Sequence, residues 1–171
     1  MIRTFKTHEV RMQEELTESL WEFEPCEGDY AGIKFQMATP GCFETNPLFA
    51  NYRGEAYFRK KITAGGNIRI ECKGVSHTAT VLLDGEQIAQ HYNAYTPFSV
   101  IKKDLTEGTH LLEIKVDNRF TEKSALHIPN DYMSYGGVSR PVVLEQISDV
   151  YIRNVHVTPY KADGKWKAKI E

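Results

Sequence analysis

Long apolar runs are missing from this sequence. No stretch of about 18 apolar residues exists to span a membrane, and the segment from Met1 to Lys6 has neither the apolar core nor the small-residue cleavage site of a secretory signal. Asn-x-Ser/Thr glycosylation acceptors are also absent. The cysteines, Cys26, Cys42 and Cys72, are odd in number and too widely spaced for a disulfide framework or a zinc knuckle, so we expect reduced thiols. These features predict a cytoplasmic protein with no membrane partner.

Clustered positive charge and metal-ligand spacings are missing as well. The net charge of -2 comes from 21 basic and 23 acidic residues interspersed along the chain, which excludes a basic stripe for nucleic acid. No nucleophile-elbow pattern supports a catalytic set around Ser139. The scattered histidines are His8, His77, His91, His110, His127 and His156. They lack the short spacings of a metal site, so we expect no catalytic residue, metal or cofactor here, and His77 should be structural.

The chain does have enough apolar residues for a core. Its 171 residues, 41% of them apolar, fit one ordinary domain with a short extension. Apolar and polar residues alternate almost throughout, most clearly in residues 68–72 and 112–116. This period of two predicts half-buried strands.

Turn signals divide the alternating pattern into strands. The segments 78–83 and 86–91 flank Asp84-Gly85, a two-residue turn that predicts a β-hairpin. Residues 10–19 should be an extended or one-turn lead-in, since their apolar spacing is too loose for a long amphipathic helix. About ten short strands without βαβ alternation predict an antiparallel sandwich, either jelly-roll or Greek-key. The remaining strands are expected at residues 20–24, 32–37, 54–62, 96–100, 141–146, 150–157 and 165–171.

Two connections are long. Residues 38–51, which include Pro40, Gly41 and Pro47, are predicted to wrap the surface of the sandwich. Residues 121–134 are also loop-like. Long loops at the end of a rigid sandwich often carry ligand contacts, so a binding residue is expected in the second of these segments.

Several segments, read in order, resemble the N-terminal sugar-binding domain of family two glycoside hydrolases, the group that contains β-galactosidases and β-glucuronidases. The similarity spans about residues 16–159. Each piece is short, and their order and spacing carry the resemblance. The pieces are Leu20 to Phe23, Asn51 to Lys60, Gly74 to Gly85, Tyr95 to Phe98, Val116 to Arg119 and Asp131 to Arg140.

The resemblance implies an all-β fold, an antiparallel β-sandwich of the jelly-roll, galactose-binding-domain-like type. It also implies a parent enzyme of carbohydrate metabolism, a retaining O-glycosyl hydrolase in which an immunoglobulin-like domain and a (β/α)₈ barrel follow. The barrel holds both catalytic glutamates and needs about 250 residues by itself, so this chain should be inactive alone. We expect residues 1–148 to form the sugar-binding domain with its lead-in, and residues 149–171 to be the first strands of a truncated immunoglobulin-like domain.

The resemblance implies one substrate-binding residue. In the family, an aspartate five residues before a small-Gly-aliphatic-x-Arg motif reaches into the barrel and binds substrate hydroxyls. Counting back from Gly136 gives Asp131. A carboxylate suits this role because it accepts two hydrogen bonds from adjacent hydroxyls and can separate epimers. Members often have Asn where Ser134 stands, so an amide contact there would be lost; without the resemblance, a solvated aspartate capping a turn is the simpler interpretation of Asp131.

The rest of this motif has structural interpretations. Gly136 and Gly137 are expected to permit positive φ or close backbone packing. Arg140 should be an intramolecular ion-pair partner. Tyr132 and Tyr135 are expected to pack against the barrel, which would leave an exposed apolar patch on this chain.

Aromatic residues offer a second candidate surface. Tyr92, Tyr95, Phe98, Tyr132 and Tyr135 are candidates for a platform on which sugar rings stack. Most aromatic side chains should instead be core or interface. Phe58, Phe98 and Trp166 fall in strand patterns and are expected to bury large areas.

Three functions remain open at this point. The first is the non-catalytic domain of a β-glycosidase of the β-galactosidase or β-glucuronidase type, which supports the barrel and contributes Asp131. Its partners would be a β-glycoside and the parent's own domains, with an oligomer possible. The alternative is a stand-alone carbohydrate-binding module without hydrolase activity, and the third is a domain that only docks to the barrel. The sequence does not distinguish galactoside, glucuronide and mannoside.

Overall fold

The computed structural model describes residues 12–122, 124, 128, 131, 133–152 and 155–171. These residues form ten strands and two short 3₁₀ turns. The strands are β1 (Met12–Glu15), β2 (Ser19–Pro25), β3 (Phe35–Thr39), β4 (Glu55–Cys72), β5 (Thr78–Leu83), β6 (Glu86–His91), β7 (Phe98–Asp117), β8 (Val142–Ile147), β9 (Val157–Ala162) and β10 (Lys165–Ile170). The 3₁₀ turns are η1 (Phe43–Thr45) and η2 (Pro47–Phe49).

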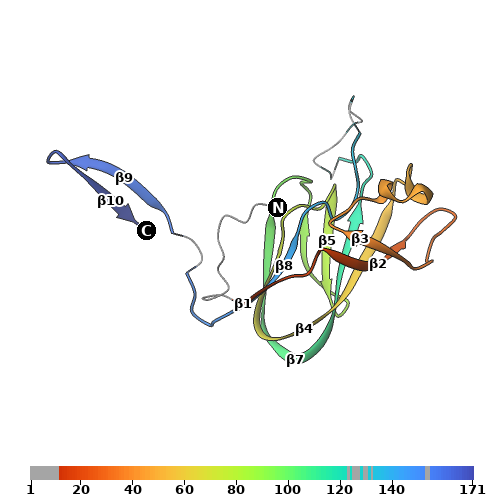
Figure 1. Cartoon of the computed structure of the whole chain (residues 1–171), viewed down its shortest axis with the longest axis horizontal. Coiled ribbons are helices and arrows are strands. Elements are labelled where there is room, and N and C mark those ends of the chain that lie inside the picture. The colour runs from red at the N-terminus through yellow and green to blue at the C-terminus, as the bar shows by residue number, and fades with distance from the viewer. Residues whose placement is uncertain (1–11, 123, 125–127, 129–130, 132, 153–154) are drawn as a thin grey trace.

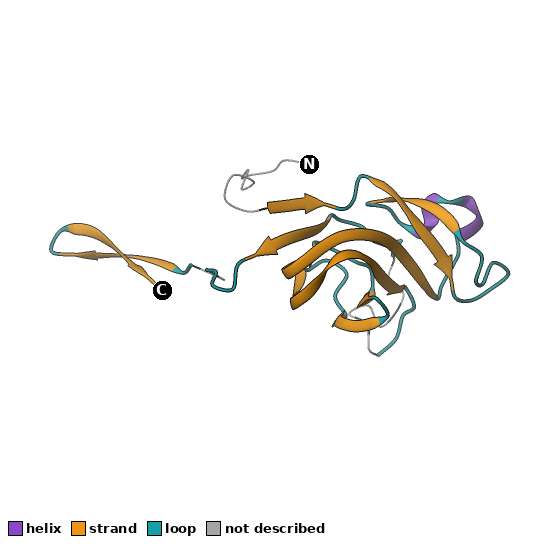
Figure 2. Cartoon of the chain, turned by 90° about the horizontal axis from the view of Figure 1, so that it is seen from below, coloured by secondary structure: helices purple, strands orange, loops and turns teal. Residues whose placement is uncertain are grey.

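Two long strands, β4 and β7, run through both layers of a sandwich (Figures 1 and 2). They pair antiparallel from Glu55 opposite Asp117 to Cys72 opposite Phe98. The first half of β4 and the last half of β7 belong to the layer β3-β2-β4-β7-β5-β6. The other halves join β8 and β1 in the second layer. The predicted all-β, antiparallel sandwich is therefore confirmed.

The continuity of β4 and β7 corrects the expectation of short strands throughout. They have 18 and 20 residues, where the sequence predicted separate strands at 54–62 and 68–72 and at 96–100 and 112–116. The pairing of the two strands shifts register on either side of Gly66, and such bulges bend a strand sharply. A bulge offsets the alternating pattern by one residue, so the sequence reads as two strands where the structure has one bent strand.

The core is aromatic on the side where residues 38–51 lie. The ring centroid of Phe23 is 5.4 Å from that of Phe43, 4.9 Å from that of Phe49 and 5.2 Å from that of Phe58. Phe43 and Phe49 come from η1 and η2, and both are buried. Residues 38–51 do run along the surface, where Thr45, Leu48 and Asn51 are exposed. The segment also closes one edge of the core, which the prediction missed, because its two phenylalanines have the apolar area to bury there.

The C-terminal strands form a hairpin of their own. β9 and β10 pair only with each other, and Figure 1 shows this hairpin standing away from the sandwich. The strand predicted at 150–157 is thus misplaced, since β9 begins at Val157. Trp166 is 75% exposed, which contradicts its expected burial, because the described residues provide no second layer over the hairpin.

Two smaller observations concern the cysteines and the helices. The cysteines Cys26, Cys42 and Cys72 are all free, and burial raises the pKa of Cys72 to about 12. Among the described residues, no helix has the length and apolar character to cross a membrane.

The predicted turn between β5 and β6 is present and anchors a histidine. Asp84 and Gly85 both have positive φ, 52° and 81°. The Asp84 carboxylate accepts a hydrogen bond from the Leu111 backbone N–H at 2.8 Å and lies 2.6 Å from Nδ1 of His110. Nε2 of His110 faces the Thr106 carbonyl at 2.9 Å, so both ring nitrogens point at acceptors and the geometry favours the imidazolium. The hydrogen bond to Asp84 first, and the Thr106 carbonyl second, raise the pKa of His110.

We expect His110→Gln to lower stability in a pH-dependent way. A raised folded-state pKa means that His110 stabilises the fold fully below its unfolded pKa of about 6.5 and ceases to do so as the pH rises through the raised value. The melting temperature of the variant should be about 2 to 4 °C below wild type at pH 6, for a loss of about 1 kcal/mol, and closer to wild type at pH 9. His156→Gln, which alters an exposed ring, is the matched control, and the same deficit at both pH values would contradict a charged His110.

Candidate functional site

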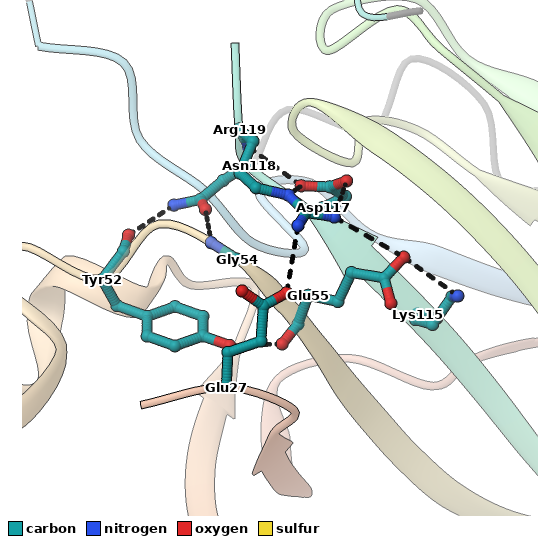
Figure 3. A network of polar contacts seen from close by, with 8 residues as sticks. All are labelled: Glu27, Tyr52, Gly54, Glu55, Lys115, Asp117, Asn118 and Arg119. Carbon is teal, nitrogen blue, oxygen red and sulfur yellow. Dashed lines mark hydrogen bonds and ion pairs between the residues drawn. The ribbon is translucent and has the colours of Figure 1, made fainter. Parts of the chain in front are cut away.

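Three segments that are distant in sequence meet at one end of the sandwich. They are the start of β4 with the residues before it, the residues that follow β7, and the stretch before β8 that contains Asp131. Figure 3 shows the polar network where the first two segments meet. This end is where the sequence predicted ligand contacts.

A buried amide joins the first two segments. The Asn118 side chain accepts a hydrogen bond from the Gly54 N–H at 2.9 Å and donates one to the Tyr52 carbonyl at 2.8 Å (Figure 3). The Tyr52 hydroxyl donates to the Glu55 carbonyl, and burial raises the pKa of Tyr52 to about 12. An amide offers a donor and an acceptor on one side chain, so Asn118 fixes the turn before β4 against the end of β7.

Ion pairs line the outer side of the same network. Arg119 donates from Nε and Nη2 to the two oxygens of Asp117 at 2.9 and 2.8 Å, and its Nη1 lies 3.1 Å from Glu27 (Figure 3). Burial alone would raise the pKa of Asp117, but the hydrogen bonds and charge of Arg119 outweigh it and leave that pKa below its ordinary value. Lys115 lies 3.0 Å from Glu55. The cations at this end are therefore paired with carboxylates.

Arg53 and Glu44 hold the stretch before β8. Arg53 donates from Nη1 to the Ser134 carbonyl at 2.8 Å, and its guanidinium lies 5.2 Å from the ring centroid of Phe120. The buried Glu44 carboxylate accepts from the Gly136 N–H at 3.2 Å and lies 3.9 Å from Arg53. Burial raises the pKa of Glu44, although its backbone hydrogen bonds and Arg53 oppose this effect. Arg53 and Glu44 therefore act as positioning residues for this stretch.

The two glycines of the motif are needed for close packing. Gly137 and Ser76 exchange two backbone hydrogen bonds of 2.9 Å, and the Gly136 carbonyl accepts from the Phe43 N–H at 2.8 Å. A Cβ on Gly136 would lie 2.5 Å from Cβ of Asn118. A Cβ on Gly137, whose φ is 139°, would lie 2.6 Å from the carbonyl oxygen of Gly41. The expected close packing is therefore present at both glycines, and the expected positive φ at Gly137.

Asp131 lies before this anchored stretch and is exposed. Met133 and Tyr135, between Asp131 and the glycines, are 45% and 54% exposed. Tyr132 lies outside the described residues, so the expected exposed patch is seen at Tyr135 but not tested at Tyr132. The structure thus places Asp131 on the solvent side of a segment whose base, from Ser134 onward, is fixed by hydrogen bonds.

Two buried polar side chains lie beneath this segment. Neither ring nitrogen of His77 has a hydrogen-bond partner of good geometry among the described residues, and the same holds for Oγ of Ser134. Burial first, and then the nearby Arg53 charge, lower the pKa of His77, which favours the neutral ring. His77 packs against Phe120 with ring centroids 5.3 Å apart, and its structural role stays a prediction.

Arg140 differs from its predicted role. It donates from Nη1 to the Tyr95 carbonyl at 3.1 Å and is exposed, and within the described residues no carboxylate lies at ion-pair distance. The carbonyl offers a neutral acceptor that sequence patterns do not reveal. The described residues also contain no group of three or more His, Cys, Asp or Glu side chains placed to hold a metal ion.

A comparison with known protein families identifies the family of this chain. Residues 49–159 match the family described as glycosyl hydrolase 2 galactose-binding domain-like, which covers well over half of the chain. The chain belongs to this family. The galactose-binding-like domain accordingly has the jelly-roll sandwich that its sequence implied.

Named relatives are glycosidases that are much longer than this chain. A β-galactosidase of Thermoanaerobacterium thermosulfurigenes is 36% identical over 96 residues, which cover 53% of this chain and 13% of the relative. A solved β-galacturonidase of glycoside hydrolase family 2 from Eisenbergiella tayi, bound to galacturonate, is 48% identical with a TM-score of 0.89, and covers 99% of this chain and 31% of that one. A β-D-glucuronidase of Dictyoglomus thermophilum shares the fold at 21% identity and a TM-score of 0.76, across 100% of this chain and 34% of its own. The galactose-binding-like domain therefore spans about a third or less of these relatives.

Four of the six segments that carried the resemblance meet at this end of the domain. Arg53 and Gly54 come from the piece 51–60, Ser76 from 74–85, Asn118 from 116–119 and Gly136 from 131–140. Sequence reasoning nevertheless missed Arg53 and Glu44 as positioning residues. The only sequence signal for Arg53 is its position in the segment 51–60 of the resemblance. Glu44 lies in the segment 38–51, which was predicted to be at the surface.

Replacing Gly136 by Ala is expected to destabilise the domain by about 1 to 3 kcal/mol, because the new methyl group would overlap the buried Asn118 side chain. Gly65→Ala is the matched control: its Cβ would lie 2.2 Å from the Glu107 carboxyl carbon, but Glu107 is an exposed, flexible side chain that can move away. Chemical denaturation of both variants measures the difference. Equal stability of the two variants would contradict a rigid contact at Gly136.

Proposed function

We propose that this galactose-binding-like domain is the non-catalytic N-terminal part of a longer retaining β-glycosidase, and that it presents Asp131 to the substrate. The observation that carries the proposal is an exposed carboxylate five residues before a glycine pair held by hydrogen bonds at both ends. The 48% identity to a β-galacturonidase over 99% of the chain supports the hydrolase parent.

Asp131 is the available acceptor among the carboxylates named at this end. Asp117 is bound by Arg119, Glu55 pairs with Lys115, and Glu44 accepts from Gly136. Among the described residues no cation lies at ion-pair distance from Asp131. A carboxylate that is already paired has fewer lone pairs left for sugar hydroxyls, whereas a solvated one exchanges only water for the sugar.

The substrate class is best assigned from the most informative relative. Because the similar β-galacturonidase was solved with galacturonate bound, we propose a β-galacturonide first, with β-galactosides and β-glucuronides as the neighbouring choices. A carboxylate at position 131 would accept hydrogen bonds from two adjacent hydroxyls of the glycone and so contribute to epimer selection.

We further propose that residues 1–148 form the galactose-binding-like domain and that residues 149–171 begin the next domain. The hairpin β9–β10 supports this division, since it pairs only with itself and exposes Trp166 and Ile170 at 75% and 69%. Apolar side chains of that size are normally covered by another layer. A cytoplasmic location stays a prediction from the free thiols.

Asp131→Asn in the full-length protein is expected to lower kcat/KM for an aryl β-galacturonide by about 100-fold or more, because one oxygen acceptor becomes a donor. The melting temperature should be unchanged, since the side chain is exposed. Asp29→Asn, at another exposed loop aspartate, is the matched control. Wild-type activity of the Asp131 variant would overturn the role of Asp131 while leaving the family assignment intact.

The 171-residue chain by itself is expected to release no product from aryl β-galacturonides, β-galactosides or β-glucuronides, because neither catalytic glutamate of a barrel is present. Reading the gene downstream for a barrel with two suitably placed glutamates is the companion observation. Turnover by the isolated, purified chain would contradict the proposal directly.

A further inference from the structure

An open hollow of about 600 Å³ lies on the outer face of the layer that contains β4, β7, β5 and β6. Its size is within the range of small-molecule sites in proteins. Asp131 does not line it, and neither do Glu44, Arg53 or the glycine pair. The hollow borders the outer ion pairs of the network described above, but Asp131 takes no part in it, so an argument about the hollow does not depend on Asp131.

One wall of the hollow carries four uncharged polar side chains that are not committed elsewhere. They are Thr78 and Thr80 from β5 and Gln87 and Gln90 from β6. Within the described part of the chain, none of these four side chains makes a hydrogen bond. Hydroxyls and primary amides both donate and accept, which is the pattern that sugar hydroxyls also present. A saccharide could therefore form hydrogen bonds with these side chains without breaking any hydrogen bond within the described part of the protein.

The charged side chains beside this wall cancel in pairs. Thr78 lies next to Asp117 and Thr80 next to Lys115 in the pairing of β5 with β7. Lys115 lies 3.0 Å from Glu55, and Arg119 lies 2.8 Å from Asp117. An anionic ligand would meet the Glu55 and Asp117 carboxylates beside each cation, so these pairs offer it no net positive charge. The electrostatics therefore favour a neutral ligand over a uronate or a phosphate.

Aromatic surface completes the hollow on the β6 side. Tyr92 follows β6, lines the hollow and is 63% exposed. His91 beside it is held in place, because its ring stacks on Phe98 with centroids 4.5 Å apart and its Nε2 lies 2.9 Å from the Thr96 hydroxyl. An exposed ring next to polar groups combines an apolar face with nearby hydrogen bonding, as protein sites for small polar ligands do.

We propose that this hollow is a second carbohydrate site, which binds a neutral saccharide through the Thr78, Thr80, Gln87 and Gln90 side chains with a ring against Tyr92. It would hold a neutral segment of a glycan on the non-catalytic domain, apart from the glycone bound near Asp131.

NMR titration of the ¹⁵N-labelled 171-residue chain tests this inference. The probes are methyl β-galactoside, a neutral β-1,4-galacto-oligosaccharide and, as the charged counterpart, di-galacturonate. The neutral oligosaccharide should shift the amide signals of residues 78–80 and 87–92 saturably with a Kd of about 1 mM, and di-galacturonate should bind at least about fivefold more weakly. Absence of saturable shifts in these residues at about 10 mM of the neutral sugars, or tighter binding of di-galacturonate there, would overturn the proposal.

Matched variants locate the binding. Tyr92→Ala and Gln90→Ala alter exposed side chains, and each should raise the Kd of the neutral oligosaccharide by about tenfold. Tyr160→Ala and Gln36→Ala, at exposed positions away from the hollow, should leave that Kd unchanged. Asp131→Asn should leave the titration unchanged, so a failure of the substrate-contact proposal does not affect this test. Equal affinity of the Tyr92 and Gln90 variants to wild type would overturn the assignment. Loss of the shifts in the full-length protein would do the same, because the hollow would then be covered by another domain.

Discussion

The close approach of residues 136–138 to the segment 41–44 constrains everything at the loop end of the sandwich. Phe43 and Gly41 donate backbone hydrogen bonds to the carbonyls of Gly136 and Val138, each at 2.8 Å, and Ser76 closes the other side through Gly137. A side chain at either glycine would collide with Asn118 or with the Gly41 backbone. The chain can enter β8 by this path only without a Cβ at two successive positions, so the segment that carries Asp131 starts from a fixed base.

The long strand pair transmits that constraint to the rest of the fold. Asn118 follows directly on β7 and is the residue that a Gly136 side chain would meet. Asn118 accepts a hydrogen bond from Gly54, which comes directly before β4. The register that pairs Glu55 with Asp117 therefore sets where Asn118 stands, and Asn118 sets how near Gly136 can come. A shift of one residue in this pair would turn each side chain to the opposite face. The geometry at the loop end thus depends on a ladder that reaches around the bend at Gly66.

Local patterns in the sequence predicted the features that local forces decide. The Asp84-Gly85 hairpin and the alternating strands β2, β5, β6, β8 and β10 follow from turn chemistry and from a period of two. Burial of Phe43 and Phe49 did not, because it depends on which strands leave an open edge. The continuity of β4 was hidden by its bulges, and Trp166 was expected inside because an alternating strand does not reveal whether a second layer is present. Asp131 came from motif resemblance alone, while Glu44 and Arg53 are recognisable only once the backbone that they hold is in place.

The two candidate sugar contacts differ in what each can do alone. One hydrogen bond to a charged group contributes about 1.5 to 3 kcal/mol, whereas a 1 mM complex needs about 4 kcal/mol, so an exposed carboxylate such as Asp131 cannot hold a sugar by itself. It can still discriminate among sugars that other groups bind, because discrimination depends on differences in affinity. The hollow beside β5 and β6 presents two amides, two hydroxyls and an aromatic ring together, and these contacts can add up to measurable affinity. Saccharide binding by the isolated chain would therefore report on the hollow, and activity of a full-length enzyme would report on Asp131.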